Sequence, residues 1–432
     1  MFGIFASQDR KMRANAVQWL DVADKVYHYR RDRLTNTELG ELHESANNLR
    51  RLVKDKADKM KLKLGIESLE GVLRQHGGTH YPKSSLVENI EFFLVAAIVI
   101  LGFRAYFIQP FKIPTNSMWP SYYGMTPEVF ERPADEPGLL LEGVRFILFG
   151  ARPVRVESPA DGEVLIPVFG NHDKLAIPYE TVAARNWLVF PTTKKQYTLL
   201  VGGKPVTLQV PADFDFEWTV RNAFFPETQV NQDPAQSDLA QVLNAQKDQL
   251  RDSSGRFRFL KTGKMVKKGD RVLAFDVLTG DQLFVERMSY HFFPPKVGQG
   301  FVFKTGKIDS IYMQDSAGRQ IDQYYVKRLA GVPGDTLEIK DYGLYRNGKP
   351  ITGAAAFAKN AQRADHFVGY RNEHGLDVGQ TMTVPANGYL ALGDNSANSQ
   401  DGRYWGYVPA SEVVGRPIFI YYPFTKRWGP SR

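Results

Sequence analysis

Residues Leu86 to Pro120 read LVENIEFFLVAAIVILGFRAYFIQPFKIPTNSMWP and are the most informative part of this chain. Its first part, Leu86 to Ile108, is mostly apolar, but the uninterrupted apolar run from Phe92 to Phe103 has only about 12 residues. That length alone suggests a buried core helix rather than a membrane span. With the flanks included, about 23 residues are available, and two glutamates near the start and Arg104 near the end can extend toward lipid headgroups. We therefore predict a single transmembrane helix over 86–108 that contacts a lipid bilayer.

The position of this segment and the charges around it predict its orientation. It begins too far from the N-terminus to be a cleaved signal peptide, so we expect a permanent anchor. Basic residues are frequent in the preceding segment, which favours a cytoplasmic N-terminus and places the C-terminal bulk of the chain outside the cytoplasm.

Residues 1–83 alternate apolar and charged side chains at helical spacing, which predicts two or three amphipathic helices. Thr35 and Glu38 have the spacing of a capping box at a helix start. Acidic residues are interspersed among the basic ones, so we interpret the charges as a solvated helical face rather than a specific lipid site. The apolar residues that mark the expected helix faces are Ala14, Val17, Leu20, Leu39, Leu42, Leu49 and Leu52.

From Pro110 onward, short β-branched and aromatic runs are bounded by Gly, Pro, Asp and Asn, a pattern typical of a β-rich domain. The polar stretch 233–256 is predicted to be a linker or excursion, with 237–250 as one short surface helix. The strand candidates are 271–275, 301–304, 324–329, 336–339 and 418–422.

Composition limits the chemistry that this chain can use. The 432 residues are 43% hydrophobic and include no cysteine, which excludes disulfides, thiol nucleophiles and cysteine-based zinc sites. The net charge of +8 fits an anionic membrane surface or nucleic acid equally well, but no nucleic-acid-binding pattern is present. We expect no nucleic-acid partner, no metal and no cofactor.

Three spaced segments carry the candidate chemistry. They are PFKIPTNSMWP from Pro110 to Pro120, YVKRLAGVPGD from Tyr325 to Asp335, and GDNSANSQDGRYW from Gly393 to Trp405. In this order they resemble the conserved boxes of type I signal peptidases. GDQLFVERMSY from Gly280 and PKVGQGFVF from Pro295 resemble two further boxes. The resemblance extends over roughly 86–121 and 280–424.

The residues of these segments suggest a mechanism independently of the family. A serine hydroxyl is a weak nucleophile and needs a base, and no histidine lies within the boxes. Lys327 can fill that role, since Val326 and Leu329 give it an apolar strand context in which burial favours the neutral amine. Without the other boxes, Lys327 would be read as an ordinary strand lysine.

The resemblance implies roles for individual residues. Ser117 corresponds to the nucleophile, Lys327 to the general base, Ser399 to the serine that orients the lysine, and Thr115 to a side-chain donor of the oxyanion hole. Structural members of the last box are Asp394, Asp401 and Arg403, with Asp401 placed to pair with Arg403. The pockets for small substrate side chains correspond to Ile113, Pro114, Met118, Tyr325 and Val326. The implied substrate is the Ala-x-Ala site of a signal peptide, bound as an added strand.

The resemblance also implies the architecture, which is mainly β. We expect a cytoplasmic helical segment over 1–83, the anchor over 86–108, a nucleophile segment over 109–123, an inserted β-rich module over 124–279, and the rest of a signal-peptidase-like domain over 280–432. This predicts a single-pass protein of the cell inner membrane whose catalytic domain is periplasmic. Its function would be removal of signal peptides from secreted preproteins.

The sequence also departs from the family pattern. Thr-Asn-Ser at 115–117 replaces the commoner Ser-Gly-Ser, Trp119 is bulky, Gln299 replaces an aspartate, and Gly402 replaces a serine. The insertion 124–279 is the largest departure. Its stretches 158–164 and 263–273 are similar to the two halves of a biotinyl/lipoyl-like sandwich, although no attachment hairpin is evident, so a small β-module is favoured over a carrier domain.

Two other functions remain open. A membrane-anchored adaptor could use the β-module and keep the peptidase boxes as a scaffold, but a scaffold does not need Ser117, Lys327 and Ser399 together. A soluble self-cleaving repressor shares the serine and lysine chemistry, but the anchor and the lack of a DNA-binding motif argue against it.

Overall fold

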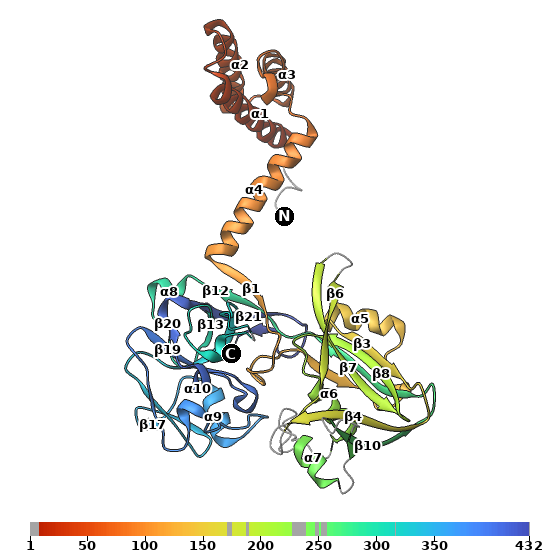
Figure 1. The fold of residues 1–432 in the computed structure, drawn as a ribbon. Helices are drawn as coiled ribbons and strands as arrows, with labels where there is room; N and C mark the ends of the chain where they lie inside the picture. The colour runs from red at the N-terminus through yellow and green to blue at the C-terminus, as the bar shows by residue number, and fades with distance from the viewer. Residues whose placement is uncertain are drawn as a thin grey trace. The chain divides into compact units, whose positions relative to one another are not determined.

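The computed structural model describes residues 8–170, 175–186, 190–226, 239–246, 250–251, 257–315 and 317–431. The chain divides into two compact units, residues 1–102 and residues 103–432 (Figure 1). Helices form the first unit, whereas β-sheets dominate the second. The predicted mainly β architecture therefore applies to the second unit, and the helical content is concentrated before residue 107.

Within the described residues, the α-helices before the apolar segment are α1 (Gln8–Arg30), α2 (Asn36–Lys54) and α3 (Lys59–His76). The predicted capping box is confirmed, because the Thr35 side chain accepts from the Glu38 amide and the Glu38 carboxylate accepts from the Thr35 amide. Asp58 caps α3 in the same way through the Lys61 amide. These caps fix the start of two helices that share one hydrophobic core.

The predicted apolar face of α1 is partly wrong. Leu20 is buried as expected, but Ala14 and Val17 are exposed, and the buried stripe consists of Ala16, Leu20, Ala23 and Val26. Small alanines suit this interface, since they let α1 approach its neighbours closely. On α2, Leu42 and Leu49 are buried as predicted, while Leu39 and Leu52 are half-buried.

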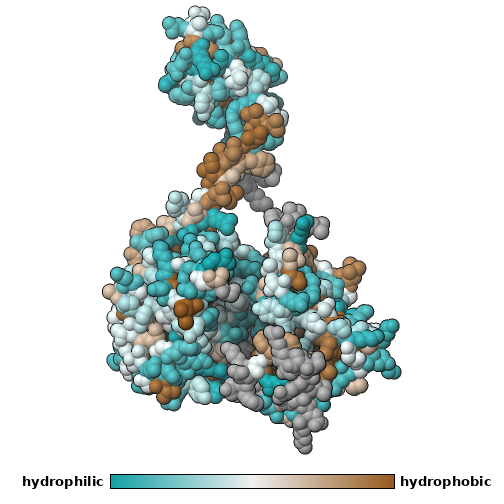
Figure 2. Space-filling model, viewed as in Figure 1, coloured by the Kyte–Doolittle hydropathy of each residue, from teal (hydrophilic) through white to brown (hydrophobic). Residues whose placement is uncertain are grey.

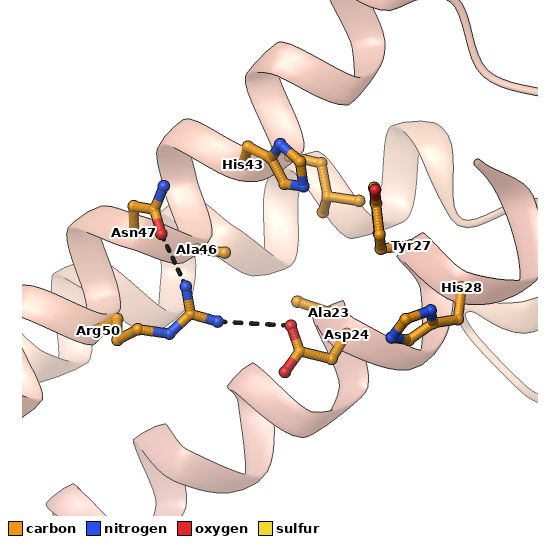
Figure 3. A pocket seen from close by; sticks show the side chains of 9 residues that line it. Ala23, Asp24, Tyr27, His28, His43, Ala46, Asn47 and Arg50 are labelled. Carbon is orange, nitrogen blue, oxygen red and sulfur yellow. Dashed lines mark hydrogen bonds and ion pairs between the residues drawn. The ribbon is translucent and has the colours of Figure 1, made fainter.

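A pocket of about 300 Å³ lies between α1 and α2. Figure 3 shows the side chains that line it. Its wall includes Arg50, which donates to Asn47 at 2.7 Å and to Asp24 at 3.4 Å. Tyr27 and His43 line the opposite side. None of the predicted site residues lies in this pocket.

The apolar segment forms α4 (Ser85–Tyr106), 22 residues long and apolar enough to cross a membrane by length and composition. None of its residues is buried and most are exposed, so it is not a buried core helix. Figure 2 shows the hydrophobic surface of α4 beside the mostly hydrophilic surface of the preceding helices. The helix ends two residues before the predicted boundary, because Ile108 already belongs to the first strand.

The second unit contains a sheet in the order β1-β12-β21-β13-β14-β19-β20, with β22 paired to β21. All of its pairs are antiparallel, and β1 at the edge follows α4 almost directly. Its strands are β1 (Ile108–Lys112), β12 (Gln282–Glu286), β13 (Gly300–Lys304), β14 (Tyr324–Gly331), β19 (Gly388–Leu392), β20 (Val408–Pro409), β21 (Val413–Tyr422) and β22 (Gly429–Pro430). The five predicted strand segments all lie in strands of the second unit.

A smaller four-stranded sheet follows β14, in the order β17-β16-β15-β18. It has its own core, to which Phe357 of α9 contributes. Its elements are β15 (Thr336–Lys340), β16 (Gly343–Arg346), β17 (Lys349–Pro350), α9 (Ala355–Gln362) and β18 (Met382–Thr383).

The chain between the nucleophile segment and β12 forms a separate β-rich module. Its two ends meet where Thr126 pairs with Leu278, so the module leaves and returns at one point. A seven-stranded sheet and a three-stranded sheet enclose a common core. The strands are β2 (Thr126–Val129), β3 (Arg152–Glu157), β4 (Gly162–Gly170), β5 (Leu175–Ala176), β6 (Tyr179–Asn186), β7 (Phe190–Val201), β8 (Lys204–Pro211), β9 (Leu250–Arg251), β10 (Arg258–Val266) and β11 (Arg271–Leu278).

Among its described residues, this module contains the helices α5 (Leu139–Phe149), α6 (Phe216–Phe224) and α7 (Leu239–Ala245). The predicted surface helix over 237–250 is partly wrong, because α7 is shorter and buries Leu239 and Leu243 in the core of the module. Leu250 belongs to a strand, and residues 237–238 and 247–249 of the prediction lie outside the described residues. The two sandwich-like stretches lie side by side, with Met265 opposite Glu163.

Candidate active site

Ser117 lies in a turn directly after β1, and a neighbouring asparagine fastens that turn. The buried Asn116 side chain accepts from the Gly124 amide and donates to the Met125 carbonyl, both at 2.9 Å. A Cβ at Gly124 would lie 2.4 Å from the Thr115 carbonyl oxygen, so only glycine permits this approach. The departure from Ser-Gly-Ser therefore gives the turn two side-chain hydrogen bonds.

Lys327 stands in the middle of β14 and faces the serine. It is paired with Phe301 of β13, is only 3% exposed, and its Nζ lies 2.6 Å from the Ser117 Oγ. The two residues are 210 positions apart in the chain. The fold thus brings the first and second boxes into direct hydrogen-bond contact.

Burial lowers the pKa of Lys327 from 10.5 to about 8. Asp401 and Asp394 act in the opposite direction, and the Arg403 charge lowers the pKa further. No carboxylate among the described residues pairs with the lysine, because those two aspartates pair with arginines. A substantial fraction of Lys327 is therefore neutral near pH 8, as a general base requires.

Ser399 completes the surroundings of the lysine. Its buried Oγ lies 3.1 Å from the Lys327 Nζ, and its carbonyl accepts from Arg403 at 3.1 Å. Arg403 also pairs with Asp401 at 2.9 Å, the pairing that the sequence predicted. A Cβ at Gly393 would lie 2.1 Å from the Ser399 Oγ. The last box thus holds the Ser399 hydroxyl against the lysine.

A second buried ion pair, between Arg328 and Asp394, lies beside the pair of Arg403 and Asp401. The sequence analysis did not identify Arg328. Arg328 donates to both carboxylate oxygens of Asp394, at 2.8 Å and 2.5 Å, and to the Gly298 carbonyl at 2.7 Å. The Ser121 hydroxyl also donates to Asp394. The Lys-Arg dipeptide at 327–328 could have indicated this arginine. Successive residues of a strand point to opposite faces of the sheet, so the two cations are expected on different faces.

Thr115 is exposed on the rim of the turn. Within the described part of the chain, its hydroxyl has no hydrogen-bond partner, and the Ser117 amide has no acceptor. Both groups are therefore available to a ligand that approaches Ser117. The described residues also contain no cluster of three or more His, Asp or Glu side chains that could hold a metal.

Comparisons with known proteins point to one family. Residues 273–422 match the family described as signal peptidase, peptidase S26. A signal peptidase I of Bacillus licheniformis is 34% identical over 148 residues, which cover 34% of this chain and 70% of the relative. The chain belongs to the signal peptidase family.

Two further relatives are similar over shorter shares of their own length. The probable signal peptidase I-1 of Synechocystis sp. is 30% identical over 150 residues, 35% of this chain and 66% of the relative. Signal peptidase I S of Bacillus subtilis is 39% identical over 108 residues, 24% of this chain and 55% of the relative. The chain thus covers less than two thirds of these two relatives.

A solved signal peptidase I from Enterococcus faecalis has 26% identity and covers 28% of this chain and 97% of its own. Its TM-score of 0.19 is too low for a comparison of folds. The family match of residues 273–422 includes Lys327 and Ser399 but not Ser117 or Thr115. The contact between Ser117 and Lys327 is therefore the observation that links the first box to the matched region.

The residues that the signal peptidase resemblance assigns to substrate pockets are not equally accessible. Ile113 and Met118 are buried at 5% and 1% in the core beneath the turn, and Val326 packs partly against that core. Pro114 is exposed and Tyr325 is half-buried. Of these five, Pro114 borders a described cavity, of about 300 Å³, which also includes Lys112 of β1 and Asp213 of the inserted module.

The inserted module, which the sequence resemblance does not explain, also contacts the nucleophile segment. The buried ring of Trp119 lies 6.0 Å from the ring of Trp218 in α6, in an edge-to-face arrangement. On its other side, Trp119 lies 5.6 Å from the ring of His366. The bulky residue two positions after Ser117 is thus packed between the module and the rest of the unit.

Proposed function

We propose that this protein is a membrane-bound serine endopeptidase that removes signal peptides from exported preproteins with a Ser117 and Lys327 dyad. The observation that supports this proposal best is the 2.6 Å distance between the Ser117 Oγ and the Nζ of the buried Lys327. The lowered pKa of Lys327 provides the neutral amine that proton transfer needs. Family membership favours the same reaction.

The proposed reaction begins when the neutral Lys327 Nζ takes the Ser117 proton while Oγ attacks the scissile carbonyl carbon. The Ser117 amide and the Thr115 hydroxyl then donate to the developing oxyanion. Lys327 passes its proton to the departing amine, which leaves an ester on Ser117. A water molecule, deprotonated by the same lysine, hydrolyses that ester. Ser399 keeps the lysine amine directed at Ser117 throughout.

The free edge of β1 is suited to binding a substrate as an added strand. β1 is the first strand of its sheet, so its outer edge has no partner strand among the described elements, and the chain runs from it directly into the Ser117 turn. The C-terminal part of a signal peptide, in an extended conformation, would pair along this edge up to the scissile bond. Of the five residues assigned to substrate pockets, Ile113 and Met118 lie buried beneath the turn, so Pro114, Tyr325 and Val326 would border the substrate. Shallow pockets of this kind would admit only small side chains, as in an Ala-x-Ala site.

The decisive experiment is cleavage of a preprotein by the purified full chain in detergent. Ser117→Ala and Lys327→Ala should abolish cleavage, and Lys327→Arg should do the same because its guanidinium stays protonated. Lys340→Ala, at an exposed lysine of β15, is the matched control and should retain full activity. If Lys327→Ala or Lys327→Arg kept more than about a tenth of wild-type activity, Lys327 could not be the general base.

We further propose a single span over α4, with the N-terminal helices in the cytoplasm and the catalytic unit in the periplasm. The length of α4 and the basic residues before it support this topology. Protease added to spheroplasts should then degrade the second unit. Protection of that unit until the membrane is permeabilised would contradict the topology.

A further inference from the structure

Helix α5 of the inserted module presents its apolar side chains to the outside. Leu139 and Leu140 are 85% and 90% exposed, Ile147 is 68% exposed, and no residue of the helix is buried. A surface helix of a soluble domain normally does the reverse and buries its apolar stripe. Hydrophobic surface is visible in the area of α5 (Figures 1 and 2).

The polar residues of α5 hold it in this orientation. Arg145 is only 15% exposed and pairs with Glu128 at 2.7 Å and with the buried Asp276 at 3.0 Å. Glu142 pairs with Arg155 at 3.5 Å. Because ion pairs fix the charged face against the module, the outward direction of the apolar face is part of the fold.

The exposed surface continues beyond the helix. The Phe424 amide donates to the Leu148 carbonyl at 3.0 Å, which joins the end of α5 to the C-terminal segment. Phe424 and Trp428 are about half exposed, and the exposed Lys426 lies between them in the sequence. Aromatic rings beside a lysine are typical of a membrane interface, where the amine reaches the headgroups.

The strand register keeps this surface close to the end of α4. β1 begins two residues after Tyr106, and its last residue, Lys112, pairs with Gln282, which pairs in turn with Tyr422. The Tyr422 hydroxyl donates to the Phe146 and Ile147 carbonyls of α5. The path along β1 is five residues, or about 17 Å. If α4 is the anchor proposed above, this short connection tethers α5 to the same bilayer, and the inference rests on that proposed topology.

We propose that α5, together with Phe424 and Trp428, is a membrane-docking surface whose occupant is the lipid bilayer. An apolar face with flanking basic and aromatic residues lies in the headgroup region of a membrane, with its axis along the surface. The exposed patch is then covered in the native environment, although it is exposed in the isolated chain. This docking would hold the inserted module at the membrane surface.

The absence of cysteine makes this directly testable, since any introduced cysteine is the sole labelling site. Leu140→Cys and Ile147→Cys would be labelled with an environment-sensitive fluorophore in the full chain, reconstituted in nanodiscs of phosphatidylethanolamine and phosphatidylglycerol. Lys349→Cys, at an exposed position in β17, is the matched control. Melting curves would show that the labelled proteins remain folded.

We expect blue-shifted emission at both α5 positions, loss of fluorescence with nitroxide-labelled lipid, and protection from aqueous iodide. The fluorophore at the control position should keep its emission in water, should be quenched by iodide, and should not be quenched by the nitroxide-labelled lipid. Quenching by iodide without quenching by the lipid nitroxide would overturn the proposal. So would shielding that appears only with two or more copies per disc, because a second chain would then be the occupant.

Discussion

The pH dependence of cleavage should follow the titration of Lys327. Burial lowers the pKa of this lysine from 10.5 to about 8. The change increases the ratio of neutral to charged amine about 300-fold at any pH, since each pKa unit is a factor of ten. At pH 8 about half of the enzyme then carries the neutral base, compared with about 0.3% for an unperturbed lysine.

The sign follows from the proton that the base must accept. In the proposed mechanism only neutral Lys327 is active, so kcat/KM should rise with pH and level off above the pKa. With a pKa of about 8, the increase from pH 6 to 7 should be about ninefold, and from pH 8 to 9 less than about twofold. The assay is initial-rate cleavage of a preprotein in detergent between pH 6 and 10.

Two controls separate this titration from other effects. Circular dichroism across the same pH range should show that the fold is retained. The pH dependence of kcat should be measured separately, because it reports the pKa in the enzyme–substrate complex. A profile that is flat from pH 6 to 10, or one that still rises with a pKa near 10.5, would refute the reasoning. The first result would exclude a titrating lysine, and the second would exclude a buried one.

Three further predictions test the support of the site. Asn116→Ala removes two buried hydrogen bonds of the nucleophile turn, so we expect a loss of about 1–3 kcal/mol in the free energy of unfolding, seen in urea titrations, and a lower kcat with little change in KM. Asp394→Ala leaves the buried Arg328 charge without its carboxylate and should cost about 3–5 kcal/mol, whereas replacing both residues by apolar ones should cost less than the sum of the single changes in a double-mutant cycle. Replacing 127–278 by a short loop exposes Trp119 and should lower the melting temperature, yet cleavage that depends on Ser117 should persist, because the Ser117–Lys327 contact lies outside the module; complete loss of activity in a folded deletion protein would contradict this.

The sequence predicts the elements of this fold better than their mutual contacts. Runs of β-branched residues locate the strands, and the Thr35 capping box locates a helix start, because both depend on neighbouring residues. The face of α1 was misjudged, since Ala14 and Ala16 are equally apolar and only the packing partner decides between them. The end of α4 is similarly ambiguous, because aromatic residues near Ile108 suit a strand as well as a helix.

In the site, too, the individual residues could be predicted from the sequence better than the contacts between distant segments. The boxes suggested Ser117, Lys327 and Ser399 from the sequence, and the fold places their side chains together. The role of Asn116 could not be predicted, because its partners lie at the start of an insertion that the family pattern does not describe. The packing of Trp119 on Trp218 has the same cause, since nothing in either local sequence specifies the other ring.

The two buried ion pairs explain how the pKa of Lys327 can be as low as about 8 beside two carboxylates. Asp394 and Asp401 both act on Lys327, and either one, if unpaired, would favour the ammonium form. Each is instead held by an arginine, Asp394 by Arg328 and Asp401 by Arg403. Arginine suits this task because it stays charged when buried and binds a carboxylate with two parallel donors. The charges of the last box are thus neutralised locally, and burial is left to determine the protonation state of the base.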